Sequence, residues 1–286
     1  MPQVSVSTIQ RRRREFGLSD EFDRYSDITD YEIDSGHKLI RYKLITHVCI
    51  DGKTRLLVYV SCCNNKKADT VLSLFQNGVE QWGLRSRVCC DYGMENFYVG
   101  QYMIEHRGEG RGSIITGSSV HNSRVERAHR DVYSGVLAFY VRIFEAMKNE
   151  SILDIKLSDD VHLFSLHHVY VPRINRSLNE FIQQMNNHPV STENNQSPLQ
   201  MWEKGMLEYM HSGHTALSSK EIENFGVDLE GALLVKEDHY QVNVIPPTIE
   251  LTEQQLTQMP SLLQNDENCG VNICKQCVEL IHSFLR

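Results

Sequence analysis

The order of hydrophobic patterns in the first half of the chain restricts it to few architectures. Two apolar, β-branched runs, 42–51 and 54–63, are joined by an Asp-Gly dipeptide typical of hairpins, and a shorter strand-like segment, 31–37, precedes them. Residues 67–83 then change to helical spacing, with apolar side chains on one broad face. Three strands followed by a helix predict a mixed sheet with helices packed on it.

The alternation of strands and helices continues beyond this helix. Strand-like segments are predicted over 87–91 and 113–117, with a helix over 95–108 between them and a long helix over 122–147 after them. The complete order, β-β-β-α-β-α-β-α, predicts an α/β fold with a five-stranded mixed sheet flanked by helices. Two later helical patterns, one starting at His167 and one covering the last fifteen residues before the terminal arginine, predict helical extensions of this core.

Charge is distributed unevenly along the chain. The 286 residues carry 29 basic and 37 acidic side chains, a net charge of −8, yet residues 221–286 alone carry 11 acidic and 3 basic ones, which is the same −8. Residues 34–158 hold 17 basic against 13 acidic side chains. The acidity is therefore a property of one end, and the middle of the chain is suited to face phosphates.

Neither a membrane span nor a secretory signal is expected. No run of eighteen apolar residues is present, and the eight cysteines are predicted to be reduced core residues. The N-terminal segment carries four arginines before any apolar block, unlike a secretory signal: Arg11, Arg12, Arg13 and Arg14. They would ring a short helix that either contacts DNA or serves as a solvated or localisation segment.

Three acidic residues fall where strand and helix ends would bring them together. Asp34 lies within the first predicted strand, Asp91 ends the fourth, and Glu126 lies in the first turns of the long helix. If the first and fourth strands are neighbours, the two aspartates lie about 5 Å apart. Carboxylates this close repel, so either their pKa values are raised or divalent cations lie between them. Oxygen-only ligands suit Mg²⁺ or Mn²⁺, which would activate an attacking oxygen at a phosphodiester.

The sequence around these acids resembles a known family. Four blocks carry the resemblance in the right order: YEIDSGHKLI, THVCIDGKTRLLVYV, CDYGMENF and SVHNSRVERAHRDV. They look like the integrase catalytic core, the RNase H-like, DDE-type domain of retroviral integrases and related transposases, and are especially similar to transposon-derived cellular proteins with this domain. The resemblance covers roughly residues 5–206 and implies an RNase H-like fold with helical extensions.

Carried over residue by residue, the resemblance implies that Asp34, Asp91 and Glu126 are the catalytic triad and bind Mg²⁺ or Mn²⁺. Asp91 and Glu126 are 35 positions apart, close to the spacing familiar in the family. Asp51 lies in the most apolar strand context, but in the family this position belongs to a hairpin, so we expect it to serve the turn. Gly93 is expected to let the backbone turn sharply after Asp91.

The resemblance also implies DNA as a partner. Arg124, Arg127 and Arg130 are spaced three apart on the glutamate helix and are expected to contact phosphates, although an ordinary solvated helix face would show the same pattern. His37 and Lys38 follow the first aspartate and are expected to contact DNA, with a plain surface pair as the alternative. The four N-terminal arginines would belong to a remnant of a helix-turn-helix segment.

A zinc site near the C-terminus is an alternative that we do not favour. Cys269, Cys274, Cys277 and His282 are spaced so that they could in principle form a tetrahedral site. Cys277 is also part of a helical apolar stripe with Ile273, Leu280, Ile281 and Phe284, a setting where buried free cysteines are common. The spacing matches no zinc module that we recognise. We therefore expect these cysteines to belong to the core.

These observations divide the chain into four segments: a basic helical remnant (1–28), an integrase catalytic core (29–157), a helical extension (158–210) and an acidic C-terminal region (211–286). The predicted function is Mg²⁺- or Mn²⁺-dependent cleavage and strand transfer on DNA. The protein is expected to be a homo-oligomer and to be nuclear or nucleocytoplasmic. One alternative is a domesticated, catalytically inactive module that binds nucleic acid or protein, and another is a nuclease without a transfer step. Two departures from the family bear on activity: Tyr92 replaces a small polar or amide residue, and no zinc-binding or SH3-like end domain is recognised.

Overall fold

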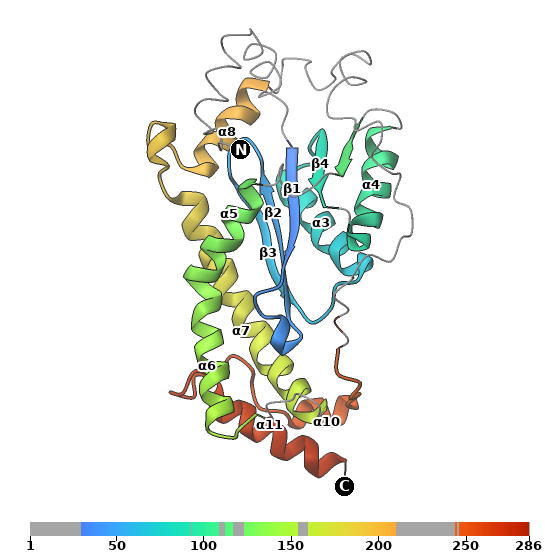
Figure 1. Cartoon of the computed structure of the whole chain (residues 1–286), viewed down its shortest axis with the longest axis vertical. Coiled ribbons are helices and arrows are strands. Elements are labelled where there is room, and N and C mark those ends of the chain that lie inside the picture. The colour runs from blue at the N-terminus through green and yellow to red at the C-terminus, as the bar shows by residue number, and fades with distance from the viewer. Residues whose placement is uncertain are drawn as a thin grey trace, which may run out of the picture.

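Five strands form one mixed sheet in the computed structural model, which describes residues 30–91, 93–108, 112–116, 123–153, 160–209, 244 and 246–285 (Figure 1). The strands are β1 (Asp30–Gly36), β2 (Ile45–Asp51), β3 (Leu57–Cys63), β4 (Arg87–Cys90) and β5 (Ile114–Thr116). Their order is β3-β2-β1-β4-β5; β2 is antiparallel to β1 and β3, whereas β4 is parallel to β1 and to β5. This arrangement is the RNase H-like fold, as the sequence predicted.

Helices cover both faces of the sheet. On one face lie α3 (Ala68–Trp82) and α4 (Phe97–Arg107); on the other lie α5 (Ser123–Val132), a π-helical turn (Tyr133–Leu137), α6 (Ala138–Asn149) and α7 (Asp160–Asn187). The remaining helices are α8 (Pro198–Tyr209), α10 (Glu253–Gln258) and α11 (Val271–Phe284), with short 3₁₀ turns at Ile40–Tyr42, Met94–Asn96 and Ser191–Glu193. None of the described helices is long and apolar enough to cross a membrane.

The two-residue period of the strands decides which side chains face which helices. On β1, Tyr31 and Ile33 are buried in the apolar cluster under α3 and α4. The alternate residues, Glu32 and Asp34, therefore point to the face covered by α5. On β4, Cys90 belongs to the α3 and α4 cluster, so the next side chain, that of Asp91, points to the α5 face. The same alternation that builds the core thus directs acidic groups toward α5.

The loop between β2 and β3 is longer than the tight turn that the sequence suggested. Five residues, 52–56, separate the strands, and the backbone takes a positive φ of 63° at Arg55 rather than at the glycine. The fully buried Asp51 carboxylate accepts hydrogen bonds from the Thr54 N–H (2.9 Å) and hydroxyl (2.6 Å). Its other oxygen lies 3.1 Å from Nε of Arg85. Asp51 therefore stabilises the loop and does not face the α5 side.

The outer edge of β3 is paired by side chains of α7. Asn175 accepts a hydrogen bond from the Cys62 N–H (2.7 Å) and donates to the Cys62 carbonyl (2.9 Å). Asn186 does the same for Leu57, at 2.8 and 3.0 Å. A register shift inserts Val58 as an extra residue of β3. The N–H and C=O groups of both Leu57 and Cys62 therefore point away from β2. An edge strand normally exposes such groups, and here a helix satisfies them.

The C-terminal helix belongs to the same apolar cluster as α7. Cys274 and Cys277 of α11 are fully buried there, and burial raises the pKa of Cys274 to about 12. Cys269 and His282 are exposed instead. Among the described residues no three His, Cys, Asp or Glu side chains are grouped as metal ligands. Cys274 and Cys277 are therefore core residues, as expected, whereas the expectation was wrong for Cys269.

Candidate functional site

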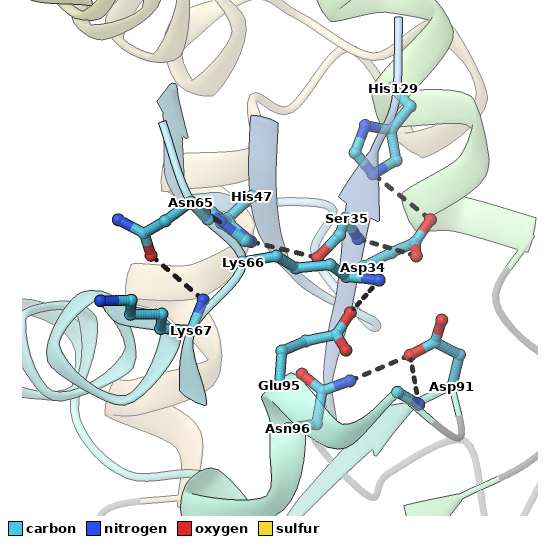
Figure 2. Close-up of polar contacts among 11 residues, drawn as sticks. Asp34, Ser35, His47, Asn65, Lys66, Lys67, Asp91, Glu95, Asn96 and His129 are labelled. Carbon is cyan, nitrogen blue, oxygen red and sulfur yellow. Dashed lines mark hydrogen bonds and ion pairs between the residues drawn. The ribbon is translucent and has the colours of Figure 1, made fainter. Parts of the chain in front are cut away.

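Asp34 and Asp91 lie on two neighbouring parallel strands, Asp34 near the end of β1 and Asp91 directly after β4. The register of β1 and β4 pairs Ile33 with Cys90, so the next pair in line is formed by the two aspartates. Neighbouring strands are separated by about 4.8 Å, which brings both carboxylates to one edge of the sheet on the α5 face. Figure 2 shows the two side chains at this edge.

Asp34 has a neighbouring partner at each of its oxygens. Oδ1 accepts a hydrogen bond from the N–H of Ser35 at 2.8 Å, and Oδ2 lies 3.3 Å from Nε2 of His129 on α5 (Figure 2). Burial acts to raise the pKa of Asp34, but the hydrogen bond and charge of His129, together with the Ser35 N–H, outweigh burial and lower it. Asp34 is therefore ionised at neutral pH.

Asp91 is oriented through one oxygen. Its Oδ1 accepts from the N–H of Gly93 at 3.2 Å and from the side-chain amide of Asn96 at 3.0 Å. Burial and the charges of Glu95 and Asp34 raise the pKa of Asp91, with the Gly93 N–H and Lys66 acting against them. The two aspartates therefore feel each other electrostatically, and a cation between them would remove this repulsion.

The position of α5 is fixed from β1. The buried carboxylate of Glu32 accepts a hydrogen bond from the N–H of Val125 at 3.1 Å, in the first turn of the helix. Four residues further along β1, Gly36 leaves room for the ring of His129, because a β-carbon there would collide with the imidazole. A carboxylate at the helix N-terminus is also favoured by the helix dipole. Glu32 and Gly36 together set how α5 lies over the aspartates.

Glu126 does not join the two aspartates in a closed cluster. It is exposed on α5, one turn before His129, and its carboxylate has no hydrogen-bond or ion-pair partner among the described residues. Among the described residues no three His, Cys, Asp or Glu side chains are grouped to hold a metal, so Glu126 does not complete a cluster with the two aspartates. The donor set of Asp34 and Asp91 still fits Mg²⁺ or Mn²⁺, because it is made of carboxylate oxygens whose mutual repulsion is only partly offset.

The predicted DNA-binding residues of α5 lie on its exposed side. Arg124 lies near Glu32 and lowers the pKa of that carboxyl against the larger, raising effect of burial. Arg127 is 4.0 Å from Asp131 one turn later, and its side chain is 76% exposed. Arg130 is exposed as well. All three arginines are thus accessible in the described structure, and their contacts to DNA stay a prediction.

The other predicted DNA-binding residues are divided between the surface and the part of the chain not described. His37 and Lys38 are exposed directly after β1, and the Lys38 ammonium lies 5.8 Å from the centre of the Tyr133 ring. The pKa of His37 is lowered, because the partial loss of water around its ring and the charge of Lys66 outweigh the neighbouring acids. The N-terminal arginines, 11–14, and the helix predicted for them lie outside the described residues.

Sequence reasoning missed four side chains of this site. His129 could have been found from its spacing, because it lies three residues after Glu126 on the same helix face. Glu95 and Asn96 follow Asp91 closely, but the sequence pattern predicted only that they begin a helix. Lys66 had no local signal, since it comes from the loop after β3 and meets the site through the fold alone.

A second group of buried charges lies at the opposite end of β1 and gives a testable pH dependence. Burial raises the pKa of Asp30 to about 6, with Arg87 offsetting only part of this effect. Its Oδ1 is buried without a hydrogen-bond partner among the described residues. Between pH 4 and 6 the folded protein therefore binds more protons than the unfolded chain, and stability falls as the pH rises through this window.

Replacing Asp30 by Asn should remove this loss. We expect Asp30→Asn to increase the free energy of unfolding at pH 7.5 by ~1–3 kcal/mol, because it removes a buried charge whose pKa is shifted by about two units. At pH 4 the gain should nearly vanish. Urea unfolding at both pH values measures the difference. An equal gain at both would show that the buried charge is not its cause.

Comparisons with known proteins identify one family, and the solved structures that match include two of one integrase. A family model described as "Integrase core domain" matches residues 28–216. The chain is also similar to the catalytic core domain of HTLV-2 integrase, solved in complex with magnesium in a trimeric and a dimeric form. For each, the identity is 14% and the TM-score 0.40, and the match covers 60% of this chain and 93% or 94% of the other. Curated protein sequences give no match.

Proposed function

The chain belongs to the integrase core domain family, and from this premise we propose that it cleaves and transfers DNA phosphodiester bonds with the help of a divalent metal ion. The observation that carries the proposal is the pairing of Asp34 and Asp91 at adjacent strand ends, under the helix that carries Glu126. Oxygen ligands so arranged suit Mg²⁺ or Mn²⁺.

In this proposal Asp34, Asp91 and Glu126 hold the metal. The bound ion supplies activation of the attacking oxygen, from water or a DNA 3′-hydroxyl, and stabilisation of the leaving oxygen. The Ser35 N–H and the Asn96 amide orient the two aspartates. They keep one oxygen of each carboxylate in place, and the second oxygen of Asp34 lies 3.3 Å from His129 of α5.

The proposal includes the surroundings of this site. Arg124, Arg127 and Arg130 would contact DNA phosphates along the exposed side of α5, as arginines beside a phosphodiester commonly do. DNA would be the partner of this chain, and the working assembly would be a homo-oligomer. The reaction would take place in the nucleus, because chromosomal DNA is the substrate of such a reaction.

A second candidate function is supported by the position of Glu126. Among the described residues no three acidic or histidine side chains are grouped for a metal, and His129 and Lys66 already partner acids of the site. Such an arrangement is compatible with a catalytically inactive module that binds DNA or protein on the same fold.

A branched DNA that mimics a joined product distinguishes these functions. Purified protein is incubated with this DNA and Mn²⁺, and the products are separated on a denaturing gel, with EDTA as the control. Resealed DNA that depends on Mn²⁺ would support the transferase, and free ends alone would indicate a nuclease. Intact DNA binding without any product would refute the enzymatic proposal and leave the binding module.

A further inference from the structure

The loop between β3 and α3 carries a lysine to the edge of the candidate site. Asn65 shapes this loop: its side-chain oxygen accepts from the Lys67 N–H (3.1 Å) and from the Thr70 hydroxyl (2.8 Å). The Asn65 carbonyl lies 3.3 Å from Nε2 of the fully buried His47. Nδ1 of His47 in turn lies 3.1 Å from the hydroxyl of Ser35. The loop is thus tied to the residue next to Asp34 through a buried contact.

Lys66 makes a nearly buried ion pair at this place. Its ammonium lies 2.5 Å from Oε1 of Glu95, whose side chain is 3% exposed, whereas that of Lys66 is 19% exposed. Figure 2 shows the Lys66 ammonium directed into the space between Asp34 and Glu95, while Lys67 points the other way. Gly93 allows this arrangement, because a β-carbon there would collide with the Glu95 carboxylate.

The pair is costly unless it serves something beyond packing. Removing an ammonium and a carboxylate from water is commonly not repaid by their attraction, and apolar residues of similar size stabilise a protein as well. The Lys66 charge also acts on its neighbours: it lowers the pKa of Asp91 against the stronger effect of burial, and it lowers that of His37. The Lys66 ammonium, held by Glu95, is therefore a positive charge close to the aspartate pair.

We propose that Lys66 is a substrate-contacting residue: Glu95 holds its ammonium beside the aspartate pair, where it donates a hydrogen bond to a DNA phosphate at the reaction site. The inference rests on the proposed function, since it assigns a phosphate to this edge of the sheet. Three carboxylates, those of Asp34, Asp91 and Glu95, repel a phosphate. A lysine among them supplies a compact positive charge with three donors, and its remaining exposure gives DNA access to it.

A double substitution that removes both charges of the ion pair distinguishes contact with phosphate from a purely structural role of Lys66. If Lys66 only neutralises Glu95, then Lys66→Met with Glu95→Gln removes both charges together and restores the wild-type behaviour. If Lys66 contacts phosphate, the double variant keeps its fold and still lacks the contact. Lys67→Met is the matched control, because Lys67 is the exposed neighbour with the same charge.

DNA binding is measured first, by fluorescence anisotropy of the branched DNA without divalent metal over a range of salt concentrations. We expect the double variant to bind about tenfold more weakly than wild type, with the slope of log affinity against log salt reduced by roughly one contact. Lys67→Met should change the affinity less than threefold. Thermal unfolding checks that the double variant is folded; if it is not, the single change Lys66→Gln is used in the same assay.

The resealing assay then gives the second readout. With Mn²⁺ we expect the rate for the double variant to fall by ~10²-fold, as expected when one preorganised donor to a phosphate is lost. A folded double variant with wild-type affinity and salt slope would overturn the inference, as would an equal loss in Lys67→Met. Absence of product from the wild type would instead refute the proposed reaction, while the binding arm would still decide the role of Lys66.

Discussion

Replacing Glu126 by Gln should lower the rate of DNA resealing by at least ~10³-fold, which corresponds to about 4 kcal/mol of transition-state stabilisation. The change is nearly isosteric and removes only the charge that would complete the proposed metal site. The side chain is exposed and has no partner among the described residues. We therefore expect the melting temperature of Glu126→Gln to stay close to that of the wild type. The Mn²⁺-dependent resealing of branched DNA is the measurement.

A matched control for this change lies in the same helical run. Glu150, at the end of α6, is exposed like Glu126 but lies far along the chain from the strand ends that carry Asp34 and Asp91. Glu150→Gln should retain wild-type activity and stability. If Glu126→Gln resealed DNA as fast as Glu150→Gln, Glu126 would play no part in the reaction and the triad would be wrong.

The sheet could be predicted from the sequence because each of its parts has a local signal. The runs that became β2 and β3 are continuous stretches of apolar and β-branched residues, and the helix that follows them shows helical spacing of its apolar residues. Asp34 and Asp91 could be paired in advance, since parallel neighbours place the ends of two strands together. The family motif supplied Glu126, which the spacing of acids alone would not have identified.

The rest of the site depends on contacts that no local pattern records. Lys66 and Glu95 are 29 positions apart and meet only because the loop after β3 turns toward the end of β4. Gly93 shows the same difficulty in another form. The sequence suggested that it is needed for a sharp turn, but its φ of −67° is open to any residue. What requires glycine is the space taken by the Glu95 carboxylate.

The protection of the sheet edge gives the largest expected effect on stability. Asn186 is 4% exposed and satisfies both backbone groups of Leu57, the first residue of β3. Asn186→Leu keeps the volume but leaves a buried N–H and a buried carbonyl without partners. We expect the free energy of unfolding to fall by ~2–4 kcal/mol, because each such group costs about 1–3 kcal/mol. Urea unfolding monitored by circular dichroism measures the loss.

The neighbouring Asn187 provides the control. It is exposed, and its amide only donates to the Gln183 carbonyl within α7, so Asn187→Leu should change stability by less than ~0.5 kcal/mol. Eleven residues of helix and five of strand both span about 16 to 17 Å, which is why Asn175 and Asn186 of one helix reach Cys62 and Leu57 of one strand. Losing one of these contacts should therefore loosen the edge locally, with faster amide exchange at Leu57 than at Cys62. Equal stability of Asn186→Leu and wild type would mean that water serves the edge of β3 as well as the helix does.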